Sequence, residues 1–461
     1  MTMHLSPTTV RPPLTVQELI AEVDGGRIDT VVMALVDMQG RLQGKRFHGR
    51  HFVDEVLVHG SEASNYLLAV DVDMNPVQGY RIASWETGYG DFTVLPDPAT
   101  LRRMPWHPGT ALLLADPAGA DGTRVAPSPR RILRGQIDRL AGHALTAYAG
   151  TEAEFLLHRE SYEEARRRGY RNLTPSTAYN ADYVLLDTAG VEPLLRRIRD
   201  EMAGAGLTPE SAKGECNLGQ HEITFRYADA LTTADQHVIY KHGAKEIAAQ
   251  EGMSITFMAK PNEREGNSCH IHFSVRDADG MPAIPGDGPG RLSVTGQRIA
   301  AGVLASMPDF SLLYAPHINS YKRYEPGSFA PTALRWGADN RTCALRVAGH
   351  GADVRLENRV PGADVNPHLA IAAMIAGAVH GLERELTLET AFAGNAYADA
   401  SAPLVPATLR DALYRWESSD LVREALGAEV ADHYANNARV ELDAFDSAVT
   451  DWELARGFER L

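Results

Sequence analysis

The stretch LTAYAGTEAEFLL, residues 145–157, predicts one long strand, or a strand pair bent at its glycine. In its second half Glu152 and Glu154 stand two residues apart, so on a strand both carboxylates lie on one face. Apolar Ala153 and Phe155 then lie on the opposite face. Two like charges on a shared face repel unless water or a cation separates them. The stretch therefore predicts either a solvated strand face or one wall of a metal site.

A second stretch, SCHIHF at residues 268–273, repeats this spacing with imidazoles. His270 and His272 would share one face of an otherwise apolar strand, where an imidazole without a partner is costly to bury. Metal ligation and ordinary hydrogen bonding in the core both stay open for this pair. Cys269 lies between them in the sequence, so its side chain would point to the opposite face and we do not expect it to bind a metal.

Three further carboxylates follow the same logic. Glu215 and Glu222 flank a glycine-tipped loop, and Glu357 stands two residues from Arg355 and from Arg359. Five carboxylates with a neutral imidazole suit two or three hard divalent cations, Mg²⁺ or Mn²⁺, rather than zinc.

Guanidinium groups gather in the same part of the chain. Arg323 precedes a Pro-Gly turn, and Arg341 and Arg346 follow it. Guanidinium groups bind phosphoryl oxygens and carboxylates bidentately. Metals that neutralise phosphates, surrounded by arginines, are the physical requirement of phosphoryl transfer. The ensemble therefore predicts an enzyme that moves a phosphoryl group.

Composition limits the alternatives. The 461 residues carry 45 Lys and Arg against 60 Asp and Glu, a net charge of −15, which argues against binding to nucleic acid or to an anionic membrane. Three cysteines at long spacings make no disulfide framework and suit a reducing compartment. No signal peptide or bilayer-length apolar run is expected, so we expect a soluble cytoplasmic protein with no membrane partner.

Strands and helices are mixed along the whole chain, which predicts an α+β fold. A stretch dense in Pro, Gly and Ala, residues 116–129, marks a domain boundary. Strands are predicted at 30–37, 41–47, 92–95, 111–115, 254–258 and 269–275. Helices are predicted at 16–24, 129–140, 193–204, 235–250, 367–383 and over the tail 408–458.

Taken in order, the motifs resemble glutamine synthetase from about Thr30 to the C-terminal region. The matching segments are EAEF at 152–155, ECNLGQHE at 215–222, KP at 260–261, His270 and His272, NSYKR at 319–323, AP at 330–331, NR at 340–341, Arg346, Glu357 with Arg359, and NP at 366–367. The resemblance implies an N-terminal β-grasp domain over residues 1–118 and a catalytic domain with an antiparallel sheet and surrounding helices over residues 119–461. It also implies a homo-dodecamer of two stacked hexamers, with active sites between neighbouring subunits.

The resemblance also implies residue roles and a reaction. ATP would phosphorylate the γ-carboxylate of L-glutamate, and an amine would attack the acyl phosphate. One metal would be held by Glu154, Glu215 and Glu222, and a second by Glu152, His270 and Glu357. The ATP site would be lined by Glu210, His272, Ser274 and Arg355. The substrate glutamate would be bound by Gly266, Arg323 and Arg359, and the transferred phosphate by Arg341 and Arg346.

Departures from the family pattern concern the amine. The flap glutamate that helps hold ammonium is Phe329 here, an aspartate supplied by the neighbouring subunit is His59, and an asparagine of the substrate site is Glu265. Phe329 can pack on methylenes or face a cation, and His59 or Glu62 can take the proton of the attacking amine. These changes predict an organic amine substrate of the ethanolamine or polyamine type, with ethanolamine slightly favoured.

Two alternative functions and one possible modification site stay open. The chain is an ordinary glutamine synthetase that uses ammonium, or it is a regulatory paralogue that keeps the ATP site without catalysis. Tyr397 lies where some bacterial glutamine synthetases carry an adenylylated tyrosine, although a plain surface tyrosine fits its partly matched surroundings better.

Overall fold

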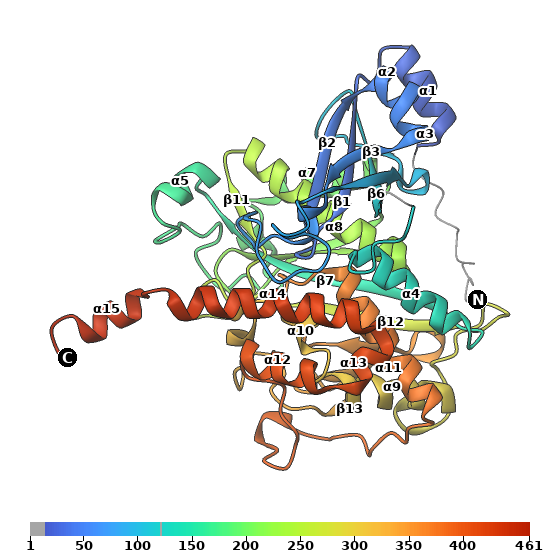
Figure 1. Cartoon of the computed structure of the whole chain (residues 1–461). Helices are drawn as coiled ribbons and strands as arrows, with labels where there is room; N and C mark the ends of the chain where they lie inside the picture. The colour runs from blue at the N-terminus through green and yellow to red at the C-terminus, as the bar shows by residue number, and fades with distance from the viewer. Residues whose placement is uncertain (1–13, 120–121) are drawn as a thin grey trace.

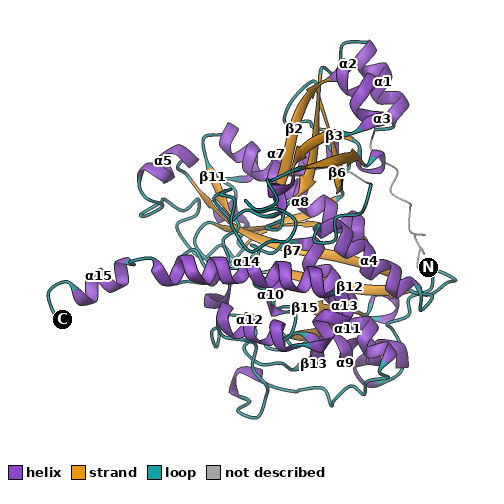
Figure 2. Cartoon of the chain, viewed as in Figure 1, coloured by secondary structure: helices purple, strands orange, loops and turns teal. Residues whose placement is uncertain are grey.

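The structure is a computed structural model that describes residues 14–119 and 122–461. Two mixed sheets with helices packed on them make up these residues (Figures 1 and 2), so the predicted α+β fold is confirmed. No helix among the described residues is long and apolar enough to cross a membrane.

The first sheet is built from the N-terminal part of the chain. Its described strands run in the order β2-β1-β6-β4-β3, with β5 paired to β6, and β1 lies parallel to β6. A first hairpin whose leading strand pairs in parallel with the last strand is the arrangement expected of a β-grasp domain. The strands are β1 (Thr30–Val36), β2 (Leu42–His48), β3 (Ser61–Ser64), β4 (Asp91–Pro96), β5 (Arg102–Arg103) and β6 (Thr110–Ala118).

The second sheet carries the chemistry-bearing strands. Its described strands run in the order β13-β14-β15-β12-β7-β9-β8, with β10 and β11 also paired to β7. The described pairs are antiparallel, as the resemblance implies, except for the parallel pair of β13 and β14. The strands are β7 (Thr146–His158), β8 (Pro209–Gly214), β9 (Gln220–Phe225), β10 (Ala228–Asp229), β11 (Ser254–Thr256), β12 (Cys269–Arg276), β13 (Trp336–Ala338), β14 (Leu345–Ala348) and β15 (Arg355–Asn358).

Helices surround the second sheet and form a long C-terminal tail. α8 begins at Ala230, five residues before its predicted start, because the Asp229 side chain caps it by accepting from the backbone N–H of Thr232 at 3.0 Å. The longer helices are α1 (Val16–Asp24), α4 (Pro129–Ala141), α7 (Glu192–Gly204), α8 (Ala230–Gln250), α9 (Val294–Ser306), α11 (Pro367–Glu383), α12 (Leu409–Ser418), α13 (Asp420–Leu426), α14 (Ala428–Ser447) and α15 (Asp451–Gly457). The shorter helices are α2 (Gly49–His51), α3 (Leu57–His59), α5 (Tyr162–Arg167), α6 (Leu185–Thr188) and α10 (Ser311–Tyr314).

Two helices pack unusually closely under the sheet. α11 starts as predicted, with the Asn366 side chain accepting from the N–H of His368 at 3.1 Å, and nearly every residue of the helix is buried. It meets α9, which the sequence did not predict, at facing glycines. A Cβ atom added at Gly302 would lie 2.1 Å from the carbonyl oxygen of Gly377, so the two backbones touch.

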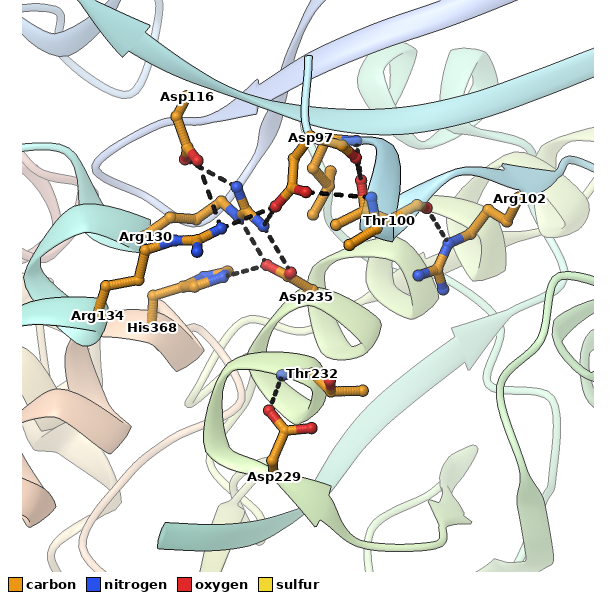
Figure 3. Close-up of polar contacts among 12 residues, drawn as sticks. Asp97, Thr100, Arg102, Asp116, Arg130, Arg134, Asp229, Thr232, Asp235 and His368 are labelled. Carbon is orange, nitrogen blue, oxygen red and sulfur yellow. Dashed lines mark hydrogen bonds and ion pairs between the residues drawn. The ribbon is translucent and has the colours of Figure 1, made fainter. Parts of the chain in front are cut away.

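A largely buried ion cluster joins the first sheet to helices α4, α8 and α11, of which α4 and α8 pack on β7 of the second sheet (Figure 3). Arg130 of α4 donates to Asp97, in the turn after β4, and to Asp116 of β6, at 2.8 Å each. It also donates to both oxygens of Asp235 of α8 at 2.9 Å, and Asp235 lies 2.8 Å from Nε2 of His368 on α11. One guanidinium group therefore links three carboxylates that lie far apart in the sequence.

All strands of the first sheet end by Ala118, and all strands of the second begin at Thr146 or later. The expected division at residues 118 and 119 falls between the sheets, and the division itself stays a prediction.

Candidate active site

The first cluster of carboxylates lies where β7, β8 and β9 meet. Glu154 of β7 stands opposite Glu222 of β9, and Glu215 follows the end of β8. One oxygen from each of the three lies within 4.8 Å of the others. Glu154 accepts from the N–H of Ser268 at 2.7 Å and from Nε2 of Gln220 at 3.0 Å. The predicted grouping of these three carboxylates is therefore present in the structure.

Burial shapes the charge of this cluster. Burial and the nearby Glu215 carboxylate raise the pKa of Glu154 to about 8. Burial, with the neighbouring carboxylates, raises the pKa of Glu222 well above its usual range. Crowded carboxylates that resist ionisation gain most from a cation placed between them.

The second cluster lies one step along the sheet, on β7, β12 and β15. His270 stands opposite Glu152, and His272 opposite Glu357. His272 Nε2 lies 2.8 Å from Glu152, while His270 Nδ1 lies 3.6 Å from Glu152 and 3.8 Å from Glu357. Ligand atoms of Glu152, His272 and Glu357 lie within 4.8 Å of one another. Cys269 is buried in the core on the other face, as expected.

The donor set of both clusters fits hard divalent cations. Burial, together with the charge of Arg359, lowers the pKa of His270 to about 4, so its imidazole is neutral near pH 7 and has a lone pair for a metal. Its Nε2 atom is buried without a hydrogen-bond partner among the described residues. Carboxylate oxygens with one or two imidazoles are ligands that Mg²⁺ and Mn²⁺ accept.

Guanidinium groups line the second cluster. Arg346 donates to Glu357 at 2.7 Å, and Arg359 donates to the other oxygen of the same carboxylate. Burial alone would raise the pKa of Glu357, but its cationic surroundings lower that pKa to about 2. Arg355 Nε donates to Nδ1 of His272 at 3.0 Å. The carboxylate stays ionised and the arginines are fixed beside it.

Arg341 lies at the rim of an open cleft of about 490 Å³. The cleft is also lined by Asp339, Asn340 and residues 391–394. Arg346 donates to Asp339 at 3.0 Å, which ties the cleft to the second cluster. Of the two arginines expected on the transferred phosphate, Arg341 lines the cleft and Arg346 is connected to it through Asp339.

Arg323 and Gly266 lie together, as predicted for the glutamate site. Arg323 is buried and donates to the carbonyl oxygen of Val360 and to Ser268 Oγ, both at 2.9 Å. A Cβ atom added at Gly266 would lie 2.5 Å from Cγ of Arg323 and 2.5 Å from the carbonyl oxygen of Ala259. A glycine is therefore required for the arginine to pass at this position.

Phe329 lies beside this group with its ring turned to solvent. Its side chain is 55% exposed, its φ is +60°, and its carbonyl oxygen accepts from Arg359 at 3.3 Å. The Tyr397 hydroxyl donates to the carbonyl oxygen of the next residue, Ala330, at 3.1 Å. Any modification of Tyr397 would have to break this hydrogen bond.

Three expected residues lie less close to the clusters. Ser274 lies two residues beyond His272 on β12, so the two share a face. Glu210 is exposed on β8, with β9 and β7 between it and β12. Glu265 lies in the loop before β12, and its carbonyl oxygen accepts from Asn217 Nδ2 at 2.6 Å.

His59 and Glu62 belong to the other sheet. His59 ends α3 and Glu62 lies in β3, apart from β12 in Figure 1. Among residues 14–119 and 122–461, neither side chain contacts the clusters described above. A single chain therefore does not bring them to Phe329.

The sequence reasoning missed Asp182. Its side chain, Glu215 and Cys216 offer ligand atoms within 4.8 Å of one another, and Cys216 Sγ lies 3.6 Å from Asp182 Oδ2. Asp182 lies in a loop without periodicity, so no pattern in the sequence marks it.

A model of the glutamine synthetase catalytic domain matches residues 126–457, well over half of the chain. The chain belongs to the glutamine synthetase family. Within it, the chain is 63% identical to γ-glutamylethanolamide synthetase GlnA4 of Streptomyces coelicolor, over 98% of this chain and 97% of that protein. It is 36% identical to glutamate–isopropylamine ligase of a Pseudomonas species, over 94% of this chain and 96% of that protein.

A solved structure of the same glutamine synthetase fold, an ADP complex of GmaS, matches with a TM-score of 0.83. That match has 27% sequence identity and covers 95% of this chain and 99% of the other.

Proposed function

We propose that this chain is an ATP-dependent carbon–nitrogen ligase that joins the γ-carboxylate of L-glutamate to an organic amine through a γ-glutamyl phosphate. The observation that carries the proposal is the pair of carboxylate clusters on one face of β7, bordered by Arg323, Arg346 and Arg359. The identity with γ-glutamylethanolamide synthetase over nearly the whole of both chains supports an amine of the ethanolamine type.

The geometry supports a role for each group of residues. We assign Glu154, Glu215 and Glu222 to one divalent cation, and Glu152 and Glu357 with His270 or His272 to a second. Such cations, when bound, neutralise the phosphates of ATP. Arg323 is held rigidly by Val360 and Ser268 and would fix the carboxylate of glutamate. Arg341 and Arg346 would neutralise the phosphoryl group during its transfer.

We assign a part in selection of the amine to Phe329, at the entrance of the site. An exposed phenyl ring at Phe329 offers an apolar or cation–π surface where an ammonium-using enzyme has a carboxylate. The same position supports ethanolamine or another alkylamine over ammonium.

We also propose an assembly of the family type, a homo-dodecamer with active sites shared between chains. The support is the placement of His59 and Glu62 on the first sheet, away from the clusters of the same chain. Three free cysteines fit a reducing compartment, and we place the reaction in the cytoplasm.

The test is phosphate release that depends on ATP and glutamate, with Mg²⁺ or Mn²⁺, across ammonium, ethanolamine, isopropylamine, putrescine and spermidine at matched concentrations. Release with ethanolamine and little with ammonium is the expected result. Release with ammonium alone would return the chain to ordinary glutamine synthetase. No release with any amine would make it a regulatory paralogue.

A further inference from the structure

A primary alkylammonium group is already seated beside the first cluster, and it belongs to the chain itself. Lys213 Nζ contacts Glu215, lies 3.7 Å from Asp182 Oδ1, and lies 4.7 Å from the centre of the Tyr183 ring. Two carboxylates and an aromatic face therefore surround one ammonium ion.

The backbone conformation around Asp182, Tyr183 and Gly214 positions the aspartate and tyrosine side chains. Asp182 pairs in parallel with Gly214 at the end of β8, which sets its side chain beside Glu215. A Cβ atom added at Gly214 would lie 2.3 Å from the carbonyl oxygen of Ala181, so a glycine is needed for the loop to come this close. Tyr183 has a φ of +57°, an uncommon backbone conformation for a tyrosine, and its ring covers the lysine.

We propose that Asp182 determines specificity for the amine by binding its cationic nitrogen, together with Tyr183, in the position that the Lys213 ammonium group occupies. The proposal rests on the proposed function and names a residue for it. Protonated ethanolamine and isopropylamine carry the same cation on a carbon chain as the lysine does.

The geometry also leaves room for entry and exchange. The side chain of Asp182 is 36% exposed and Tyr183 is largely exposed, so a small amine reaches them from solvent. Glu215 is shared with the first metal cluster, whereas Asp182 is outside that group of three. When Glu215 binds a divalent cation of the first cluster, Asp182 is the carboxylate that remains to bind the amine. Lys213 then acts as an internal competitor that the substrate displaces.

Steady-state kinetics with ethanolamine test the proposal. In Asp182→Asn the KM for ethanolamine is expected to rise about tenfold or more, because a charge-assisted hydrogen bond is lost. The KM values for ATP and glutamate should change less than about twofold, which also shows that the variant folds. Asp187→Asn, a matched change five residues along the same segment, should behave as the wild type.

A second variant moves the same quantity in the opposite direction. Lys213→Met removes the competing ammonium group, so the KM for ethanolamine should fall while Asp182 is intact. An ethanolamine KM within twofold of wild type in Asp182→Asn would overturn the proposal. An effect of Asp182→Asn on the Mn²⁺ requirement alone would also overturn it, because Asp182 would then serve a cation with Cys216. Loss of the proposed function itself is distinguishable, since wild-type protein would then release no phosphate with any amine.

Discussion

Glu154 shows how one residue makes metal binding depend on pH. Its pKa is raised to about 8 without a metal, so near pH 7 the carboxyl group is largely protonated. A metal binds the carboxylate and must expel the proton, so affinity is lower below this pKa and rises as pH increases toward it. We expect Mn²⁺ affinity, measured by titration calorimetry, to rise by up to tenfold per pH unit between about pH 6 and pH 8. Glu154→Gln should flatten the slope, and a pH-independent affinity in the wild type would contradict the assignment.

We expect Arg341 to act in transfer of the phosphate of ATP rather than in binding of ATP. The residue lines the open cleft rather than contacting the histidine cluster, where Arg355 is fixed on His272. Arg341→Ala should therefore lower phosphate release by about 10²-fold or more while ATP affinity changes little. Arg355→Ala is the contrasting variant and should weaken ATP binding. Full turnover of Arg341→Ala in a phosphate-release assay would remove the role assigned to it.

At the scale of secondary-structure elements, the close crossing of α9 and α11 is the most sensitive feature. Gly302→Ala would place a methyl group 2.1 Å from the Gly377 carbonyl oxygen, so the helices must separate. We expect a loss of about 1–3 kcal/mol in the free energy of unfolding. Gly135→Ala in α4, where no atom lies within 4 Å of the added Cβ, is the control and should stabilise by about 0.5–1 kcal/mol. Equal denaturation midpoints for the two variants would show that α9 and α11 have room for a methyl group where they cross.

The strands explain which parts of the site could be predicted from the sequence. On β7 and β12 the period of two fixes the face, so spacing alone predicts that Glu152 and Glu154 share one face and that His270 and His272 do, while their roles stay predictions. α9 was missed because it is buried on several sides and has no polar stripe to give it a helical period. Asp182 was missed because a single bridge to Gly214, distant in the sequence, positions it.

At the scale of the whole molecule, Arg130 joins the first sheet to helix α8, which packs on the second sheet (Figure 3). It is 1% exposed and compensates Asp97, Asp116 and Asp235 together. Arg130→Met would leave the buried Asp235 carboxylate without its guanidinium partner, while Arg134 still contacts Asp97 and Asp116. We expect a loss of about 3–5 kcal/mol in stability, measured by chemical denaturation. Arg131→Met changes an arginine of the same helix for which the described chain shows no ion pair, and it should cost little.

The stability that this cluster provides depends on pH, because the pKa of Asp235 is lowered in the folded state. Burial would raise the pKa of Asp235, but Arg130 and His368 hold it well below its usual range. A depressed folded-state pKa adds stability above the unfolded-state value near 3.8, and that stability is lost as pH falls below it. The stability difference between wild type and Arg130→Met should therefore shrink in strong acid. A difference that stays constant down to acid unfolding would contradict this account.

The C-terminal helix α15 projects from the end of α14, away from both sheets in Figure 1. Its apolar residues are open to water: Trp452 is 68% exposed and Phe458 is 85% exposed. Burial of these rings against a second copy would stabilise the fold only when two copies associate. The stability of the fold would then depend on protein concentration. The melting temperature of the protein should then climb with its concentration. Removal of residues 449–461 should weaken this dependence on concentration.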